Sequence, residues 1–131
     1  MIRLKQFTMP AVVQSPMASC TDLPFRLIAR AQGMAFAFLE MISSEALARN
    51  VRQTLELMQT IPEDQPVGAQ IVGCDPAVMG EAAAKIEDLG FALVDVNLGC
   101  PVPKSFRKVG ARCCCASPRR QHRFLRASSD P

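Results

Sequence analysis

The chain has 131 residues, 49% of them hydrophobic, and carries 15 Lys and Arg against 12 Asp and Glu, a formal net charge of +3. This composition excludes an intrinsically disordered chain and supplies enough apolar side chains for one folded domain. No apolar stretch is long enough to span a bilayer, and the N-terminus lacks the apolar segment of a secretory signal, so we expect a cytoplasmic protein.

The first predicted unit is a short buried strand at Val12-Val13 that leads into an exit turn over residues 15–18. Thr21 or Asp22 can cap the helix that follows, and Gly33 can close it.

The second unit begins with the continuous apolar run 35–39, which ends at Glu40. Ser43 or Ser44 can cap the next helix, which Pro62 stops. This helix is predicted to carry Leu47, Val51, Leu55 and Met58.

The third and fourth strands are predicted at residues 67–72, with Gln70 as the one polar side chain, and at residues 92–96. Between them, Asp75-Pro76 starts a helix that Gly90 closes. Its predicted buried face contains Val78, Ala82, Ile86 and Leu89, and Glu81 and Lys85 form a favourable i,i+4 pair.

The order of these elements, β-α-β-α-β-α-β with nearly continuous apolar strands, is typical of a parallel sheet covered by helices. Right-handed crossovers bring all the strand ends to one edge. No Gly-x-Gly-x-x-Gly follows any strand, so we favour a barrel over a doubly wound sheet. A (β/α)8 TIM barrel needs about 200–250 residues, and we therefore predict an α/β fold with the first four βα units of such a barrel.

The segment Asn97-Leu98-Gly99-Cys100-Pro101 directly follows the fourth strand. A thiol in this place is often only a buried core residue. Polar groups also follow the earlier strands, however, and catalytic residues of barrel enzymes lie at the carboxyl ends of strands. We therefore interpret this turn as part of an active site.

Four segments in the same order resemble the bacterial tRNA-dihydrouridine synthase family. They are residues 15–26 (SPMASCTDLPFR), 39–43 (LEMIS), 70–73 (QIVG) and 95–101 (DVNLGCP), and the resemblance covers residues 9 to about 104. It implies an FMN-binding barrel that uses NADPH to reduce uridine in tRNA to 5,6-dihydrouridine.

The resemblance also implies roles for six residues. Backbone groups of Pro16, Met17 and Ala18 line the flavin, and Gln70 hydrogen-bonds its polar edge. Asn97 places the substrate base. Cys100 is the general acid, and a thiol suits this role because its pKa can be tuned towards neutrality.

Five other residues receive no catalytic role. Glu40 is left unassigned, Arg26 and Arg30 are interpreted as solvated helix charges, and Cys20 and Cys74 are interpreted as packing residues. No Cys-x-x-Cys pair occurs and the chain has a single histidine, so we expect no metal site.

The resemblance to the family ends after Lys104. Residues 105–131 hold seven basic residues and one acidic residue, against 8 and 11 in residues 1–104. Cysteines 113–115, if encoded TGC-TGC-TGC, become Leu-Leu when read one base away, and the family carries leucines about there. We therefore interpret 1–104 as the N-terminal half of the barrel and 105–131 as a basic, disordered or out-of-frame tail. An open half-barrel of this kind is expected to have little or no activity by itself.

Two other functions compete with the synthase. One is a dihydroorotate-dehydrogenase-like FMN barrel, against which the segment around Pro16 and Asp22 speaks. The other is a non-catalytic remnant whose basic tail binds RNA weakly and in a salt-sensitive way.

Overall fold

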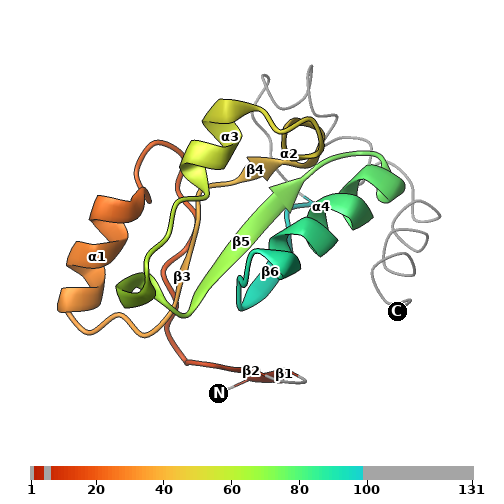
Figure 1. Cartoon of the computed structure of the whole chain (residues 1–131). Helices are drawn as coiled ribbons and strands as arrows, with labels where there is room; N and C mark the ends of the chain where they lie inside the picture. The colour runs from red at the N-terminus through yellow and green to blue at the C-terminus, as the bar shows by residue number, and fades with distance from the viewer. Residues whose placement is uncertain (1, 5–6, 99–131) are drawn as a thin grey trace.

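A computed structural model describes residues 2–4 and 7–98 (Figure 1). The strands are β1 (Ile2–Leu4), β2 (Phe7–Met9), β3 (Ala37–Phe38), β4 (Ile42–Ser43), β5 (Val67–Val72) and β6 (Leu93–Val96). The helices are α1 (Leu23–Ala31), α2 (Ser44–Ala48), α3 (Arg52–Leu57) and α4 (Pro76–Asp88), with a 3-10 turn η1 (Pro62–Asp64). The described residues form an α/β fold with a parallel sheet, as predicted.

The sheet is built around β5, and its neighbours follow chain order. β3 pairs with the start of β5 and β4 with its end, both in parallel on the same edge, while β6 pairs in parallel with the opposite edge. Beyond β3, Gln14 forms a parallel bridge with Ala37. Because all these strands run in parallel, their carboxyl ends meet at one edge of the sheet.

The first predicted strand is wrong in extent. Val12 is 80% exposed, and the segment contributes only the Gln14 bridge to the sheet. Both Gln14 backbone groups bond to the next strand, the N–H to Phe36 at 3.0 Å and the carbonyl to the Phe38 N–H at 3.2 Å. The segment therefore lies in the predicted place as an edge bridge and not as a buried strand.

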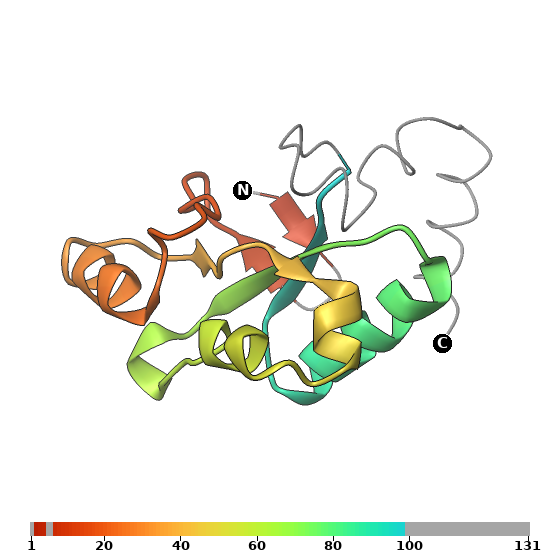
Figure 2. The same ribbon diagram turned by 90° about the horizontal axis from the view of Figure 1, so that it is seen from above.

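The helices lie on one side of the sheet (Figure 2), and the core fills the space between. Its members are Leu39, Ile42, Leu47, Met58, Val67, Ala69, Ile71, Met79, Ala82, Ile86 and Phe91. β3 and all of β5 except Gln70 are buried, as their nearly continuous apolar runs indicate, whereas β6 is half-buried.

Side-chain caps fix where three helices begin. Asp22, Ser43 and Asp75 each accept a backbone N–H from the following turn, at 3.0, 3.3 and 2.9 Å. From the sequence, either Thr21 or Asp22 could cap α1 and either Ser43 or Ser44 could cap α2. In the structure, Asp22 and Ser43 are the caps. Gly33 and Gly90 follow α1 and α4 with φ of 92° and 83°, the left-handed conformation that ends helices.

The helix predicted to carry Leu47, Val51, Leu55 and Met58 is interrupted. It is two helices, α2 and α3, separated by a turn in which Asn50 has φ of 54°. The turn changes the direction of the chain, so a single helical face does not continue across it. Leu47 and Met58 are buried, whereas Val51 and Leu55 are each 40% exposed.

Two predictions for α4 are also wrong. In the described part of the chain, Lys85 forms no ion pair with Glu81. Its ammonium instead donates to the Leu47 carbonyl at 3.4 Å and to the Asn50 side chain, which ties α4 to the end of α2. Leu89 is 53% exposed because the helix ends just before it.

No helix in the described part of the chain is long and apolar enough to cross a membrane.

An antiparallel pair, β1 with β2, precedes the sheet and was not predicted from the sequence. It lies at the end of the sheet where β5 begins (Figure 1). It is therefore remote from the edge where the strands end.

Two glycines give opposite expectations for the same added methyl group. A Cβ on Gly73 would lie 2.1 Å from Ser44 Oγ and 2.9 Å from Met79 Cγ, both buried. Gly73→Ala is therefore expected to destabilise the protein by about 1–3 kcal/mol. A Cβ on Gly80, inside α4, meets nothing within 4 Å, so Gly80→Ala is expected to stabilise by about 0.5–1 kcal/mol. Urea denaturation measures both, and equal stabilities for the two variants would contradict this packing.

Candidate functional site at the carboxyl ends of the strands

The loop that follows Gln14 is closed by hydrogen bonds between Met17 and Thr21. The Thr21 hydroxyl accepts the Met17 N–H and donates to the Met17 carbonyl, both at 3.1 Å, and the Cys20 and Thr21 N–H groups donate to the same carbonyl at 3.1 Å. Thr21 is fully buried, whereas Met17 and Ala18 are exposed. One buried threonine therefore holds an exposed loop in a defined shape.

Glu40 holds the same loop from the next strand. Its Oε2 accepts the Ser19 N–H at 2.7 Å, and Ser19 has φ of 59°, a left-handed conformation that a non-glycine residue rarely adopts. Glu40 is only 9% exposed, and a hydrogen bond to a buried carboxylate is stronger than a neutral one. The sequence left Glu40 unassigned, although its place directly after a buried strand was the available signal.

The ends of β5 and β6 carry a second hydrogen-bonded group. Gln70 Nε2 donates to Asp95 Oδ2 at 2.6 Å, and Asn97 Nδ2 donates to Gln70 Oε1 at 3.1 Å. Gln70 and Asp95 are register partners on adjacent parallel strands, so their side chains leave the same face of the sheet. The three side chains are half-buried. No role was assigned to Asp95 from the sequence, although it begins the segment 95–101 that resembles the family.

The structure thus brings Gln70 and Asn97 together, and it places Pro16, Met17 and Ala18 at the same edge of the sheet, on the loop that Glu40 anchors. Within the described residues, neither the Ala18 N–H nor its carbonyl has a hydrogen-bond partner. Cys100, with the turn around it, lies outside the described residues.

Arg26 is fully buried, which contradicts its interpretation as a solvated charge. Its guanidinium contacts Asp64 Oδ2 through Nε at 2.9 Å and through a terminal nitrogen at 2.8 Å. It also donates to the carbonyls of Thr21 at 2.7 Å and Gln59 at 2.9 Å. Asp64 is itself fully buried. Arg26 therefore joins α1 and the loop at Thr21 to the turn η1.

Arg30 is half-buried and also serves the fold, donating to the carbonyls of Asp64, Pro66 and Ala35. Cys20 is exposed and not a packing residue, and Cys74 is half-buried. No group of three or more His, Cys, Asp and Glu side chains in the described ranges could hold a metal ion.

The sequence of this chain matches the model of a known protein family. The family model described as "Dihydrouridine synthase (Dus)" matches residues 13–128, which include the loop at Met17, Gln70 and the segment from Asp95 to Cys100. This chain belongs to the dihydrouridine synthase family. The resemblance found in the four sequence segments is thereby confirmed. The matched range continues past Lys104, where the sequence analysis ended the resemblance.

Curated relatives of the dihydrouridine synthase family match the chain at 33–39% identity. "tRNA-dihydrouridine synthase B" of Pseudomonas aeruginosa is 36% identical over 108 residues, 82% of this chain and 32% of that protein. "Probable tRNA-dihydrouridine synthase" of Rickettsia prowazekii is 39% identical over 95 residues, 71% of this chain and 29% of that protein. "Probable tRNA-dihydrouridine synthase 1" of Synechocystis is 38% identical over 100 residues, 76% and 28% respectively. The chain spans about a third of the length of these dihydrouridine synthase relatives.

Proposed function

We propose that this chain is part of an FMN-dependent enzyme that reduces uridine in tRNA to 5,6-dihydrouridine with NAD(P)H. The observation that carries the proposal is the dihydrouridine synthase family match over residues 13–128, together with relatives named tRNA-dihydrouridine synthases. A tRNA substrate also supports a cytoplasmic location.

For the fold, we propose that residues 1–104 form the N-terminal half of a (β/α)8 barrel. The parallel neighbours follow chain order from Gln14 through β3 and β5 to β6. This sequential order, without reversal, is typical of barrels, whereas a doubly wound sheet reverses its strand order at the binding crevice.

The described residues fit the polar groups of FMN. A flavin ring presents both hydrogen-bond donors and acceptors, and the exposed Ala18 offers a backbone N–H and carbonyl that have no partner in the described part of the chain. Gln70 adds a side chain that both donates and accepts; of its two Nε2 hydrogens, only one is used by a described residue, Asp95. We propose that Pro16, Met17, Ala18 and Gln70 hold the flavin.

Reduction of uracil adds a hydride at C6 and a proton at C5, which saturates the bond between them. When bound, FMN supplies the hydride after its reduction by NAD(P)H. We assign the proton to the thiol of Cys100, which becomes a thiolate and recovers its proton from solvent. Asn97 orients the base.

The test uses the whole enzyme of which this chain is proposed to be a part, purified with FMN and NADPH, because the half-barrel alone is expected to have little or no activity. We expect dihydrouridine to form in an unmodified tRNA transcript, as measured by mass spectrometry of the digested nucleosides. Oxidation of dihydroorotate in place of tRNA reduction would support the dihydroorotate-dehydrogenase-like alternative. Absence of dihydrouridine in the tRNA would overturn the proposed function.

A further inference from the structure

Asp95 lies at the start of a chain of side-chain hydrogen bonds that crosses from β6 to β5 and back. Asp95 accepts from Gln70 Nε2 at 2.6 Å, and Gln70 Oε1 accepts from Asn97 Nδ2 at 3.1 Å. Asp95 forms no ion pair with any Lys or Arg in residues 2–4 and 7–98. Its carboxylate therefore serves the amide of Gln70 and not a neighbouring charge.

The direction of these bonds follows from the chemistry of the three groups. An ionised carboxylate only accepts hydrogen bonds, whereas an amide side chain has one donating end and one accepting end. Gln70 must then turn its NH2 towards Asp95, which leaves its carbonyl for Asn97. Asn97 in turn must offer its own NH2 to that carbonyl. One acceptor-only group thereby selects the orientation of two amides.

We propose that Asp95 is a positioning residue that fixes the amide orientation of Gln70 and, through Gln70, that of Asn97. This rests on the proposed function, in which Gln70 contacts the flavin and Asn97 the substrate base. The carboxylate determines which donor and acceptor the two amides present to these rings. Asp95 itself touches neither ring in this scheme.

In the isosteric variant Asp95→Asn, the orientation of the Gln70 amide is no longer determined, because an asparagine can either accept a hydrogen bond from Gln70 or donate one to it. We expect the dissociation constant for FMN to rise about tenfold, which corresponds to the loss of about 1.4 kcal/mol from one mispaired contact. Thermal stability without FMN should change little, since Asp95 is half-buried and its partner is still able to bond. Flavin fluorescence titration and thermal melting measure the two quantities.

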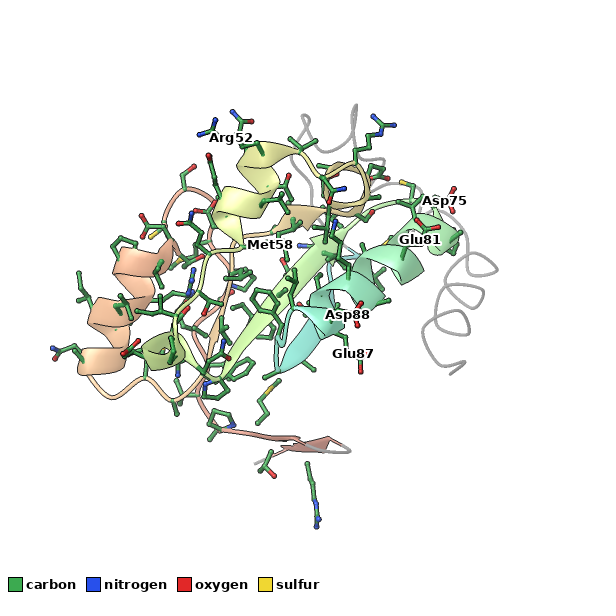
Figure 3. All side chains as sticks on the ribbon, viewed as in Figure 1. Arg52, Met58, Asp75, Glu81, Glu87 and Asp88 are labelled. Atoms are coloured by element: carbon green, nitrogen blue, oxygen red, sulfur yellow. The ribbon has the colours of Figure 1, made fainter. Side chains whose placement is uncertain are left out.

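A spectroscopic readout separates orientation from simple packing. In the ¹⁵N-labelled protein without FMN, the side-chain NH2 signals of Gln70 and Asn97 should both shift in Asp95→Asn. The matched control is Asp88→Asn, the same chemical change at an exposed residue at the end of α4 (Figure 3). It should leave both signals and the FMN affinity unchanged.

An exchange variant tests the direction of the chain of bonds and covers the case in which Asp95→Asn does not fold. In Asp95→Asn combined with Gln70→Glu, the carboxylate is moved to β5, where it accepts from the amide introduced on β6 and from Asn97. The Asn97 signal should return to its wild-type position, while FMN binding stays weak because the Gln70 amino group is lost.

Two results would overturn the inference: unchanged NH2 signals in Asp95→Asn, or an Asn97 signal that the exchange does not restore. If wild-type protein binds no FMN and reduces no tRNA, the proposed function fails instead. The comparison of NH2 signals needs neither ligand, so it decides the role of Asp95 in either event.

Discussion

Replacing Cys100 with alanine is expected to lower the rate of dihydrouridine formation by about 10²–10⁴-fold, the usual contribution of a positioned general acid. Without the thiol, the proton for C5 of the uracil has to come from water that nothing positions. FMN binding should be unaffected, because the groups proposed to hold the flavin lie elsewhere, on the loop at Met17 and on β5. Single-turnover reduction of a tRNA transcript, with the flavin spectrum recorded in parallel, measures both quantities.

Cys74→Ala is the matched control for this variant. Cys74 also follows a strand end, since it lies two residues after β5, and it is half-buried. Its loss should change the rate by no more than a few fold. A Cys100→Ala protein that keeps more than a tenth of the wild-type rate would rule out the thiol as the proton donor.

The second large effect is expected at the buried ion pair of Arg26 and Asp64. Arg26→Met keeps most of the side-chain volume but leaves the carboxylate of Asp64 buried without its main partner. Breaking a buried pair by removing one member costs about 3–5 kcal/mol, so a large loss in the free energy of unfolding is expected. Urea denaturation of the two proteins measures it.

The chain provides a control ion pair that has the same shortest N–O distance but is exposed to water. Arg52 contacts Glu56 at 2.8 Å, as Arg26 contacts Asp64, but the Arg52 side chain is 92% exposed on α3 (Figure 3). Arg52→Met should cost less than about 0.5 kcal/mol. Similar losses for Arg26→Met and Arg52→Met would contradict the idea that burial makes the first pair important.

The sequence allowed the layout of the sheet to be predicted because its central strands are continuous apolar runs. The runs at 67–72 and 92–96 correspond to β5 and β6, and the caps at Asp22, Ser43 and Asp75 begin helices as expected. The break between α2 and α3 was missed. Apolar residues keep a helical spacing across Asn50, but the backbone leaves the helical conformation there.

The site was predicted less completely, because its supporting contacts join residues far apart in sequence. Arg26 was taken for a solvated charge, as charged helix residues usually are, and its partner Asp64 is 38 positions away. The contacts of Glu40 with Ser19 and of Asp95 with Gln70 span 21 and 25 positions. Arg26, Glu40 and Asp95 lie within the segments that resemble the family, but no local pattern in the sequence indicates which distant residue each of them contacts.

The chain-order pairing of the strands has a consequence for synthesis on the ribosome. β3, β5 and β6 each pair with a segment that has already been translated, and Gln14 waits only for Ala37. Each pairing of β5 with β3 and of β6 with β5 joins residues 25–30 positions apart, so loop closure slows it as in other parallel sheets, but each new strand finds its partner already synthesised. The βα units can therefore be added one after another as the polypeptide emerges, each helix covering its strand before the next strand leaves the exit tunnel.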